Sequence, residues 1–578
     1  MSFERPRRLR SAYSSLAAHG ESWVWLTGGA LALAIAMITG LLLFIVVRGA
    51  STFWPMPLEQ VELVDGRQVL GEITGREEVD QHVEEVQGEP SAGAARQRAA
   101  TETIRMGRRL VRTANFEMTG NHYEWFDESQ IARTSLPEWA TAVERLEGGR
   151  FHGFPLRLVH TTENRIEVVA QGPEKTWQAY EQLHPAARRR FRQAMHIDKH
   201  ERGVLQRQLR AARLAVVQAD LDRGRKSPVY VAAVEAEAEI AGRMQKQSAI
   251  LDGQTARLRE QNAGWGVEFE TASGEKRTLP LDAIVRGWQP NRLSTIGKLG
   301  VYFSRWAEFL WDDPREANSA GGVFPAIWGT VAMTLIMAMF VAPFGVLAAL
   351  YLREYASAGF LTTAVRIAIN NLAGVPSIVY GAFGLGFFCY VLGAGIDEIF
   401  FQPSLVADNQ PTFGTGGLLW ASLTLALLTL PVVIVATEEA LSAVPNSMRE
   451  GSYACGAGKW QTIRRIVLPR ALPGIMTGLI LAMARGAGEV APLMLVGVKK
   501  LAVDLPIDGT FPFVHPEREF MHLAYLIYDV GFQSPNSQAA QPMVFTITFL
   551  LVMIIALLNV TAIWARSRLK RRYVSQQF

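Results

Sequence analysis

Cysteine is almost absent from this chain. Only Cys389 and Cys455 occur among its 578 residues, and both lie in the apolar C-terminal half. The long polar stretch before them has none, so a disulfide framework is excluded for that region. No cysteine and histidine residues cluster at metal-ligand spacing, and no nucleophile and base form a recognisable set. We therefore expect neither a metal site nor an enzyme.

The chain also carries little net charge. Its formal charge of +4 is too small to indicate a nucleic-acid partner. The average composition, 49% hydrophobic and 19% charged, conceals a division of the chain. Residues 51–320 are rich in Arg, Glu and Gln, whereas residues 323–564 are mostly apolar. This division predicts a large polar part and a membrane-embedded part.

Six apolar runs are long enough to cross the hydrocarbon core of a bilayer, which takes about 20 residues. They are residues 23–47, 323–350, a run within 362–392, 416–437, 473–496 and 543–564. The first run is too long for the apolar part of a secretion signal, and no small-residue cleavage site follows it, so it reads as a retained anchor. The predicted fold class is mainly α, a six-span transmembrane helical bundle with a large α+β extracytoplasmic insert after the first span.

Basic residues in the short loops predict the direction of the spans. Both terminal tails and the loop after the fourth span are rich in Lys and Arg, whereas loop 394–415 has neither. Both termini are therefore expected in the cytoplasm, and the insert outside it. The expected parts are a basic tail 1–22, an anchor helix 23–48, a periplasmic insert 49–320, a five-span core 321–566 and a basic tail 567–578.

The insert shows signals for both strands and helices. Strand-like runs flank Asp65-Gly66, and another pair flanks residues 272–275, so we expect a β-hairpin at each end of the insert. Between them, residues 183–262 predict an antiparallel helical hairpin on a β-rich base. In the first helix apolar residues alternate in steps of four and three, as in a heptad repeat: Leu205, Leu209, Ala212, Val216 and Ala219. In the second helix they recur every seven residues: Met244, Leu251 and Leu258. A true coiled coil and a loosely packed solvated pair both fit this pattern.

The loop after the fourth span carries a spaced motif. It reads Glu450-Gly451-Ser452, then Gly456 after three residues, and Ile466, Leu468 and Pro469 after nine more. This resembles the ATPase-coupling motif of ABC importer permeases, Glu-Ala-Ala, three residues, Gly, nine residues, Ile-x-Leu-Pro. The departure is Gly451-Ser452 in place of Ala-Ala, which keeps the residues small. We expect one short helix from about residue 446 to a turn at Gly456, and a second helix ended by Pro469.

Gly458-Lys459 in the same loop suggests a phosphate-binding loop, which needs Gly, four residues, then Gly-Lys-Ser/Thr. Tyr453 occupies the position of the first glycine and Trp460 that of Ser/Thr, so the pattern fails. The chain is not expected to bind ATP. The resemblance implies that a separate partner ATPase binds ATP and magnesium, and that this chain holds no cofactor.

Three further segments resemble the permeases of phosphate-specific ABC transporters. They are residues 347–355, residues 370–381 with Asn370, Asn371 and Ser377, and residues 484–493 with Arg485 and Glu489. The resemblance covers about 320–570 and does not reach the insert. It implies the ABC importer permease fold and a location in a bacterial inner membrane.

The ionisable pair is also a candidate on physical grounds. A charge inside a span costs at least about 2.5–3.5 kcal/mol, so it is functional by default. Arg485 and Glu489 stand four residues apart, on one face of a continuous helix, and a guanidinium suits a tetrahedral oxyanion. A structural ion pair is the alternative. Asn370, Asn371 and Ser377 are weaker candidates, which line the path or merely cap and join helices.

The resulting hypothesis is a permease subunit of an ATP-driven, binding-protein-dependent phosphate importer in the lipid bilayer. The resemblance implies three partners: a homologous second permease, an ATPase dimer and a periplasmic phosphate-binding protein. Two alternatives stay open. One is a permease for another oxyanion, such as molybdate or sulfate, and the other is a membrane sensor or scaffold with a ligand-responsive outer domain.

Overall fold

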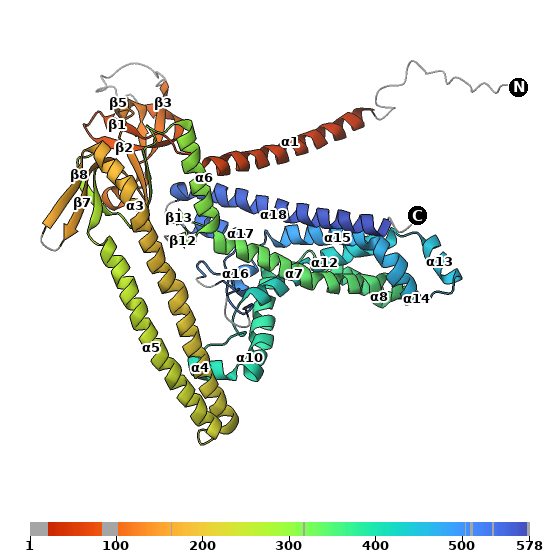
Figure 1. Ribbon diagram of the computed structural model, residues 1–578. Helices are drawn as coiled ribbons and strands as arrows, with labels where there is room; N and C mark the ends of the chain where they lie inside the picture. Colours follow the sequence, from red (N-terminus) through yellow and green to blue (C-terminus); the bar gives the residue numbers. More distant parts are fainter. Residues whose placement is uncertain are drawn as a thin grey trace, which may run out of the picture.

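The computed structural model describes residues 21–83, 102–162, 165–315, 318, 320–502, 505–508, 513–534 and 537–574. Most of the predicted tail 1–22 and the end of the tail 567–578 lie outside these residues. Figure 1 shows a bundle of long helices with a β-rich insert at one end. The start of α1 (Glu21–Ser51) and the end of α18 (Ser537–Val574) both lie at the opposite end of the bundle.

Six helices of the described chain are long and apolar enough to cross a membrane, which confirms the predicted number. These segments are Trp25–Ser51, Phe324–Tyr355, Ser377–Phe400, Leu418–Ser442, Lys459–Gly486 and Ala540–Arg568. The first belongs to α1, which packs against α18 near its end, where Phe44 lies edge-on to Phe545. The mainly α fold with an insert after the first span is therefore confirmed.

The predicted position of the third span, within 362–392, is wrong. Residues Phe360–Leu372 form a separate helix, α8, and the spanning segment begins at Ser377 with α9 (Ser377–Phe383). The break falls at Gly374-Val375-Pro376. A residue before proline avoids the helical region, and proline cannot donate to the preceding turn. The segment then continues through η5 (Gly384–Gly393) and α10 (Ala394–Phe400).

The predicted fifth span, 473–496, is misplaced as well. The helical segment begins at Lys459 and ends at Gly486, so residues 487–492 are not helical. It consists of α14 (Lys459–Thr462), a π-helical turn η6 (Ile463–Val467) and α15 (Leu468–Gly486). The prediction rested on apolar character alone, and it therefore included residues after Gly486, where Gly488 and Pro492 disfavour a helix.

Small residues bring α15 and α12 (Leu418–Ser442) into close contact. A Cβ added at Gly474 would lie 2.5 Å from the Cβ of Ala440, and one at Gly478 would lie 2.4 Å from the Cβ of Ala436. Glycine on one helix therefore faces alanine on the other, as in small-residue contacts between membrane helices. Helix α7 (Phe324–Leu350) packs against both helices.

The base of the insert consists of two antiparallel sheets. The first has the order β4-β3-β2-β1-β5, with β1 Glu59–Leu63, β2 Gln68–Val83, β3 Glu102–Arg112, β4 Tyr123–Asp127 and β5 Ile131–Ser135. The second has the order β10-β9-β7-β6-β11, and β8 pairs with β7. Its strands are β6 Thr141–Arg145, β7 Arg150–Thr162, β8 Arg165–Gln171, β9 Trp265–Glu270, β10 Lys276–Pro280 and β11 Ile284–Trp288. The pairs β1–β2 and β9–β10 are the two predicted hairpins.

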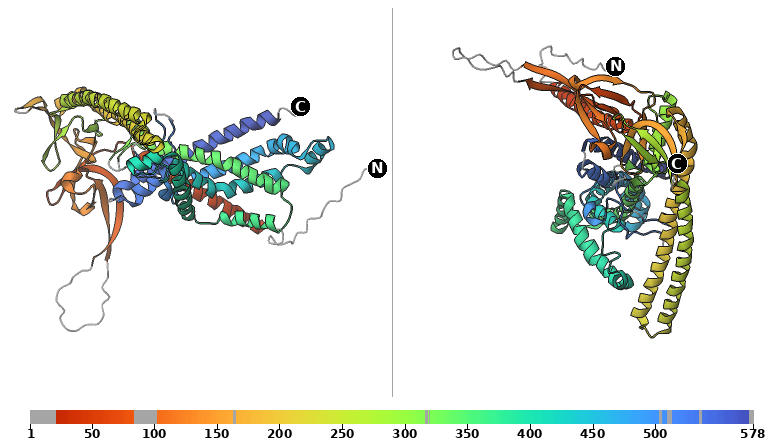
Figure 2. Two further views of the ribbon diagram at one scale, coloured as in Figure 1. Left: turned by 90° about the horizontal axis from the view of Figure 1, so that it is seen from below. Right: turned by 90° about the vertical axis from the view of Figure 1, so that its left-hand side faces the viewer.

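A long helical hairpin leaves this base and crosses the insert end of the bundle, steeply inclined to the spanning helices (Figures 1 and 2). Its first arm is α3 (Pro173–His196), a π turn and α4 (Arg202–Arg223), and its second arm is α5 (Pro228–Asn262). Leu205 and Leu251 are buried between the arms, and Met244 and Leu258 pack beside them. Partway along its length α4 contacts α11 (Gln402–Asp408) of the membrane core, where Arg210 Nη2 lies 2.7 Å from Asp408 Oδ2.

Polar groups are buried where the two sheets meet. Glu72 on β2 is 3.1 Å from an Arg112 nitrogen and 3.0 Å from an Arg150 nitrogen, and His152 on β7 is fully buried. Burial alone would raise the pKa of Glu72, but the Arg150 and Arg112 guanidiniums outweigh it and lower that pKa to about 2. Burial lowers the pKa of His152 from 6.5 to about 4. The insert therefore depends on an ionised glutamate and a neutral histidine.

This cluster predicts a pH-dependent stability of the insert. The unfolded chain protonates His152 near pH 6.5 and the folded chain only near pH 4, so its stabilisation is complete above 6.5 and is lost as pH falls through 4. The contribution of Glu72 is lost only below pH 4.5. Between pH 6.5 and 4.5 we expect protection of β7 against hydrogen exchange, corrected for intrinsic rates, to fall by about 2 kcal/mol. His152→Leu should flatten this slope and the exposed control His196→Gln should not; equal slopes in all three proteins would contradict the assignment.

Candidate functional site

The predicted coupling loop folds as a short helical hairpin at the bundle end opposite the insert (Figure 1). Helix α13 (Asn446–Ala454) is followed by Gly456, whose φ of +83° lies in the left-handed region that favours glycine. The first helix and its turn are thus as predicted. Ser452 Oγ lies 2.8 Å from Thr462 Oγ1 on α14, so the serine joins the two arms of the hairpin by a hydrogen bond.

The second helix of the loop does not end at Pro469, contrary to the prediction. Leu468 and Pro469 are the first residues of α15, and the chain is helical without interruption from Lys459 to Gly486. Proline interrupts an α-helix because its ring crowds the preceding turn and it has no N–H. Here the wider π turn Ile463–Val467 comes directly before it and accommodates the proline. Coupling loop and membrane span are therefore one rod.

A buried ion pair fastens α13 to η4 (Tyr351–Tyr355), the π-helical turn that continues α7. Arg449 Nη2 lies 2.9 Å from Glu354 Oε1, and the same guanidinium donates to the carbonyls of Leu441 and Val444. The two charged side chains are only 12% and 9% exposed. Sequence reasoning missed this pair, although Arg449 directly precedes Glu450 in the motif. The pair and these hydrogen bonds connect α13 to the end of the α7 segment and to α12.

The outer face of the hairpin combines a carboxylate with exposed aromatic rings. Glu450 is exposed on α13, and Tyr453 and Trp460 are 42% and 53% exposed. Ile466 and Leu468 are half-buried on the inner side, next to a cluster that contains Val467. Exposed tyrosine and tryptophan are typical of protein interfaces. The motif residues thus divide into a packed side and an open side.

Arg485 lies at mid-depth of the bundle. A Cβ added to its neighbour Gly486 would lie 2.5 Å from Met337 Sδ, halfway along α7, and 3.9 Å from Thr429 Cγ2, near the middle of α12. Arg485 Nε is 3.6 Å from Glu489 Oε1, and the two side chains are 42% and 20% exposed. The chain therefore presents a partly exposed guanidinium midway along the spanning helices.

The expectation that both residues share a helix face needs correction. Helix α15 ends at Gly486, and Glu489 follows in a turn, so the pair forms across a helix end. The turn packs against span three, where a Cβ at Gly381 would lie 2.6 Å from Pro492 Cα. Irregular backbone at membrane depth is tolerated where protein surrounds it or where it lines a water-filled cavity. A broken helix at mid-depth is a common setting for a transport site.

The weaker candidates lie elsewhere. Asn370 and Asn371 are exposed at the end of α8 rather than inside a span, and Ser377 is half-buried as the first residue of α9. Within the described chain no hydrogen bond or ion pair joins these three residues to Arg485 or Glu489. Asn370 instead lines a cavity of about 580 Å³ between α8 and α12, beside the Arg366–Glu438 ion pair of 3.5 Å.

Comparison with known sequences identifies the membrane core. Residues 341–575 match the family described as the binding-protein-dependent transport system inner membrane component. The membrane core matches this permease family. The match begins within α7 and leaves out the whole insert.

Individual relatives include phosphate permeases, which confirms the predicted resemblance. The phosphate transport system permease protein PstA 1 of Mycobacterium tuberculosis is 38% identical over 37% of this chain and 60% of its own length. PstA of Mycobacterium leprae is 41% identical over 36% of this chain and 63% of its own length. The chain thus spans somewhat less than two thirds of these relatives.

A PstC permease of Mesorhizobium japonicum is 30% identical over 36% of this chain and 62% of its own length. Among solved structures, a chain of the MetNI methionine ABC transporter in an inward-facing conformation aligns with a TM-score of 0.31 at 20% identity, over 42% of this chain and 94% of that chain. Six spans and the permease family match together make this a multi-pass membrane protein.

The Arg449–Glu354 pair yields a stability prediction. Arg449→Met leaves a buried carboxylate without its partner and should lower the free energy of unfolding by about 3–5 kcal/mol. The double variant Arg449→Met/Glu354→Met should recover part of that loss. Denaturant titration of the purified protein in detergent measures both. Arg366→Met breaks a more exposed pair and should cost at most about 1 kcal/mol; an equal cost for the two single variants would show that α13 is not held this way.

Proposed function

We propose that this chain is the permease subunit of an ATP-driven, binding-protein-dependent phosphate importer. The observation that carries the proposal is the rod Lys459–Gly486, which begins in the coupling hairpin and ends next to the mid-depth Arg485. At about 1.5 Å per residue its 28 residues extend about 42 Å. A displacement of the hairpin by a partner would reach the guanidinium without an intervening flexible joint.

The coupling hairpin supports an ATPase as the partner at this end. Glu450, Gly451, Ser452 and Gly456 build its open arm, and Ile466, Leu468 and Pro469 connect it to the span. Closure of a partner ATPase dimer around ATP and magnesium would push on this arm. Because Arg449 and Glu354 tie the arm to α7, both α7 and α15 would follow the motion.

Arg485 supports an oxyanion as the substrate. Its planar fork of donors matches the oxygens of phosphate, and Glu489 holds it in place until the anion arrives. Substrate would enter at the insert end and leave beside Asn370 and Arg366 at the coupling end. Relatives named as phosphate permeases favour phosphate over molybdate or sulfate.

A single permease chain encloses only half of such a path. The exposed faces of α8 and α9 support a homologous second permease as the other half, with a periplasmic phosphate-binding protein delivering substrate at the insert end. The basic loops support an orientation with both termini and the coupling hairpin in the cytoplasm and the insert in the periplasm, across a bacterial inner membrane. A sensor or scaffold function would leave the coupling hairpin without a purpose.

Phosphate uptake tests the substrate path. In phosphate-starved cells that lack the gene, the native chain should restore uptake of radiolabelled phosphate, and Arg485→Ala should abolish it at unchanged membrane levels. Arg485→Lys should restore only a part, because an ammonium lacks the planar fork. Arg568→Ala, an exposed arginine at the end of α18, serves as the matched control. If Arg485→Ala transported normally, the pair with Glu489 would be structural; if the native chain restored molybdate or sulfate uptake instead, the substrate would be wrong.

A charge reversal tests the coupling hairpin. Glu450→Lys should remove the partner ATPase from the purified complex and uncouple ATP hydrolysis from uptake, because it inverts the charge of the exposed face. Glu398→Lys makes the same change on α10 (Ala394–Phe400), away from the hairpin, and should leave co-purification unchanged. Normal ATPase recovery with Glu450→Lys would place the docking surface elsewhere.

A further inference from the structure

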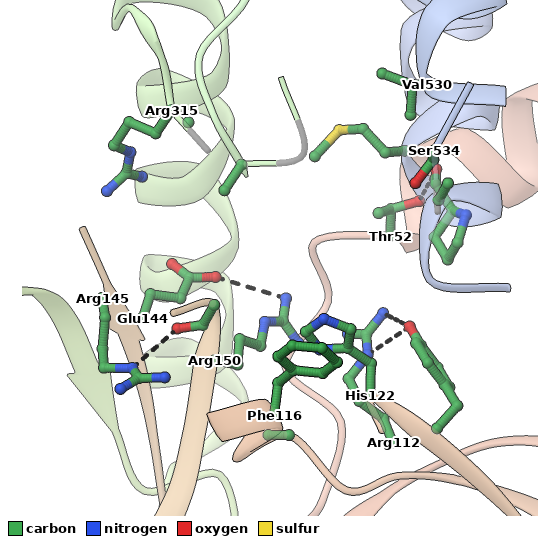
Figure 3. A pocket seen from close by; sticks show the side chains of 18 of the residues that line it. Thr52, Arg112, Phe116, His122, Glu144, Arg145, Arg150, Arg315, Val530 and Ser534 are labelled. Atoms are coloured by element: carbon green, nitrogen blue, oxygen red, sulfur yellow. Dashed lines mark hydrogen bonds and ion pairs between the residues drawn. The ribbon is translucent and has the colours of Figure 1, made fainter. Parts of the chain in front are cut away.

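A cavity of about 780 Å³ lies where the insert meets the helical bundle (Figure 3). Its membrane-side wall carries an apolar patch beside a few polar residues such as Asp529 and Gln533. This patch consists of Phe53, Phe309, Val530, Ala540 and Met543, at the end of α1, on α6 (Thr295–Trp311) and around α17 (Leu523–Phe532) and the start of α18. Most of the remaining lining belongs to the insert, outside residues 341–575. The permease family match therefore assigns no role to this cavity.

Cationic side chains are the most frequent charged groups in the cavity lining. Five come from the insert and one from the membrane core: Arg112, Arg145, Arg150, Arg305 and Arg315, and Lys500. Three carboxylates line it as well: Glu144, Glu308 and Asp529. Figure 3 shows Arg112, Arg145, Arg150 and Arg315 along the insert side of the open space, across from Thr52, Val530 and Ser534.

The internal ion pairs do not balance this charge. Glu72 lies behind the wall and pairs with both Arg112 and Arg150, and Glu117 pairs with Arg145. A further arginine, Arg286, shares Glu144 and Glu308 with the lining residues. More positive than negative charge therefore remains around the cavity.

The cavity lining also offers a buried hydrogen-bond donor that lacks an acceptor in the described part of the chain. Arg315 pairs with Glu308 through Nη2, but its Nη1 is buried and has no hydrogen-bond partner among the residues that the structure describes. Burial lowers the pKa of Arg305 to about 10, so that side chain stays charged at neutral pH. Buried donors without a partner cost free energy unless an acceptor satisfies them. An anion with several oxygens supplies such acceptors.

We propose that this cavity binds a phosphate group, carried either by an anionic phospholipid or by free phosphate. Guanidinium groups bind phosphate oxygens through paired hydrogen bonds. The apolar patch adjoins the spans at the insert end of the bundle, where an acyl chain would enter. The site is separate from Arg485 and does not depend on the proposed transport function.

Binding to the purified full-length chain distinguishes the two sources. Lipid extraction and native mass spectrometry show whether phosphatidylglycerol remains bound, and nanodiscs of phosphatidylglycerol or phosphatidylcholine show whether it rebinds after delipidation. Equilibrium binding of radiolabelled orthophosphate to the delipidated chain tests the free anion. All proteins carry Arg485→Ala, so that the mid-depth arginine contributes no binding.

Arg315→Gln is the principal variant, and Lys500→Gln, at a side chain that is 43% exposed, is the second. Because Lys500 Nζ lies 3.1 Å from the buried carboxylate of Asp529, thermal unfolding must first show that Lys500→Gln folds like the native chain. Arg259→Gln is the matched control, an arginine paired with Asp198 on the helical hairpin, 67% exposed and absent from the cavity lining. Each cavity variant should weaken binding of whichever probe the chain binds, phosphatidylglycerol or orthophosphate, about tenfold or more, and the control should not. Retained phosphatidylglycerol identifies a lipid, and orthophosphate binding alone identifies the free anion. If neither probe binds, or both cavity variants bind like the control, the proposal is wrong.

Discussion

Close packing between α12 and α15 is the constraint on which the rest of the membrane core depends. Gly474 and Gly478 face Ala440 and Ala436, and any larger side chain there would separate the helices. This contact fixes α15 along its length, so the coupling hairpin at one end and Arg485 at the other keep a constant separation. The ion pair between Arg449 and Glu354 then attaches α7 to the same unit.

Sequence patterns were a reliable guide where one physical property decided the outcome. Six runs of apolar residues gave six spans, and Asp65-Gly66 and Gly456 gave turns, because length and a positive φ leave few choices. The patterns failed where two properties opposed each other. Pro469 was expected to end a helix, but a π turn before it compensates, and no local signal announces that compensation.

The limits of the sequence are clearest for contacts between distant segments. Arg449 and Glu354 are recognisable as charges near span ends, but only the folded chain shows that they meet. The same holds for the pair Arg112 and Glu72, which lies within the insert, and for the pair Arg210 and Asp408, which joins the insert to the membrane core. Ion-pair partners depend on how elements dock, and docking is not encoded in the spacing of residues along one element. The sequence identified Asn370 and Arg485 as candidates by residue type and position. It did not reveal that the two residues lie apart in the folded chain.

The π turn before Pro469 has a geometric consequence for the whole span. In an α-helix each residue turns the chain by about 100°, so the extra residue of a π turn sets the azimuth of everything that follows it. Removal of one residue from η6 (Ile463–Val467) would therefore turn α14 relative to α15 by about 100°. Because Gly474 and Gly478 hold α15 against α12, the coupling arm rather than Arg485 would change its direction. The coupling arm and Arg485 lie on one helical segment. The number of residues in the π turn between them therefore sets the direction of one relative to the other.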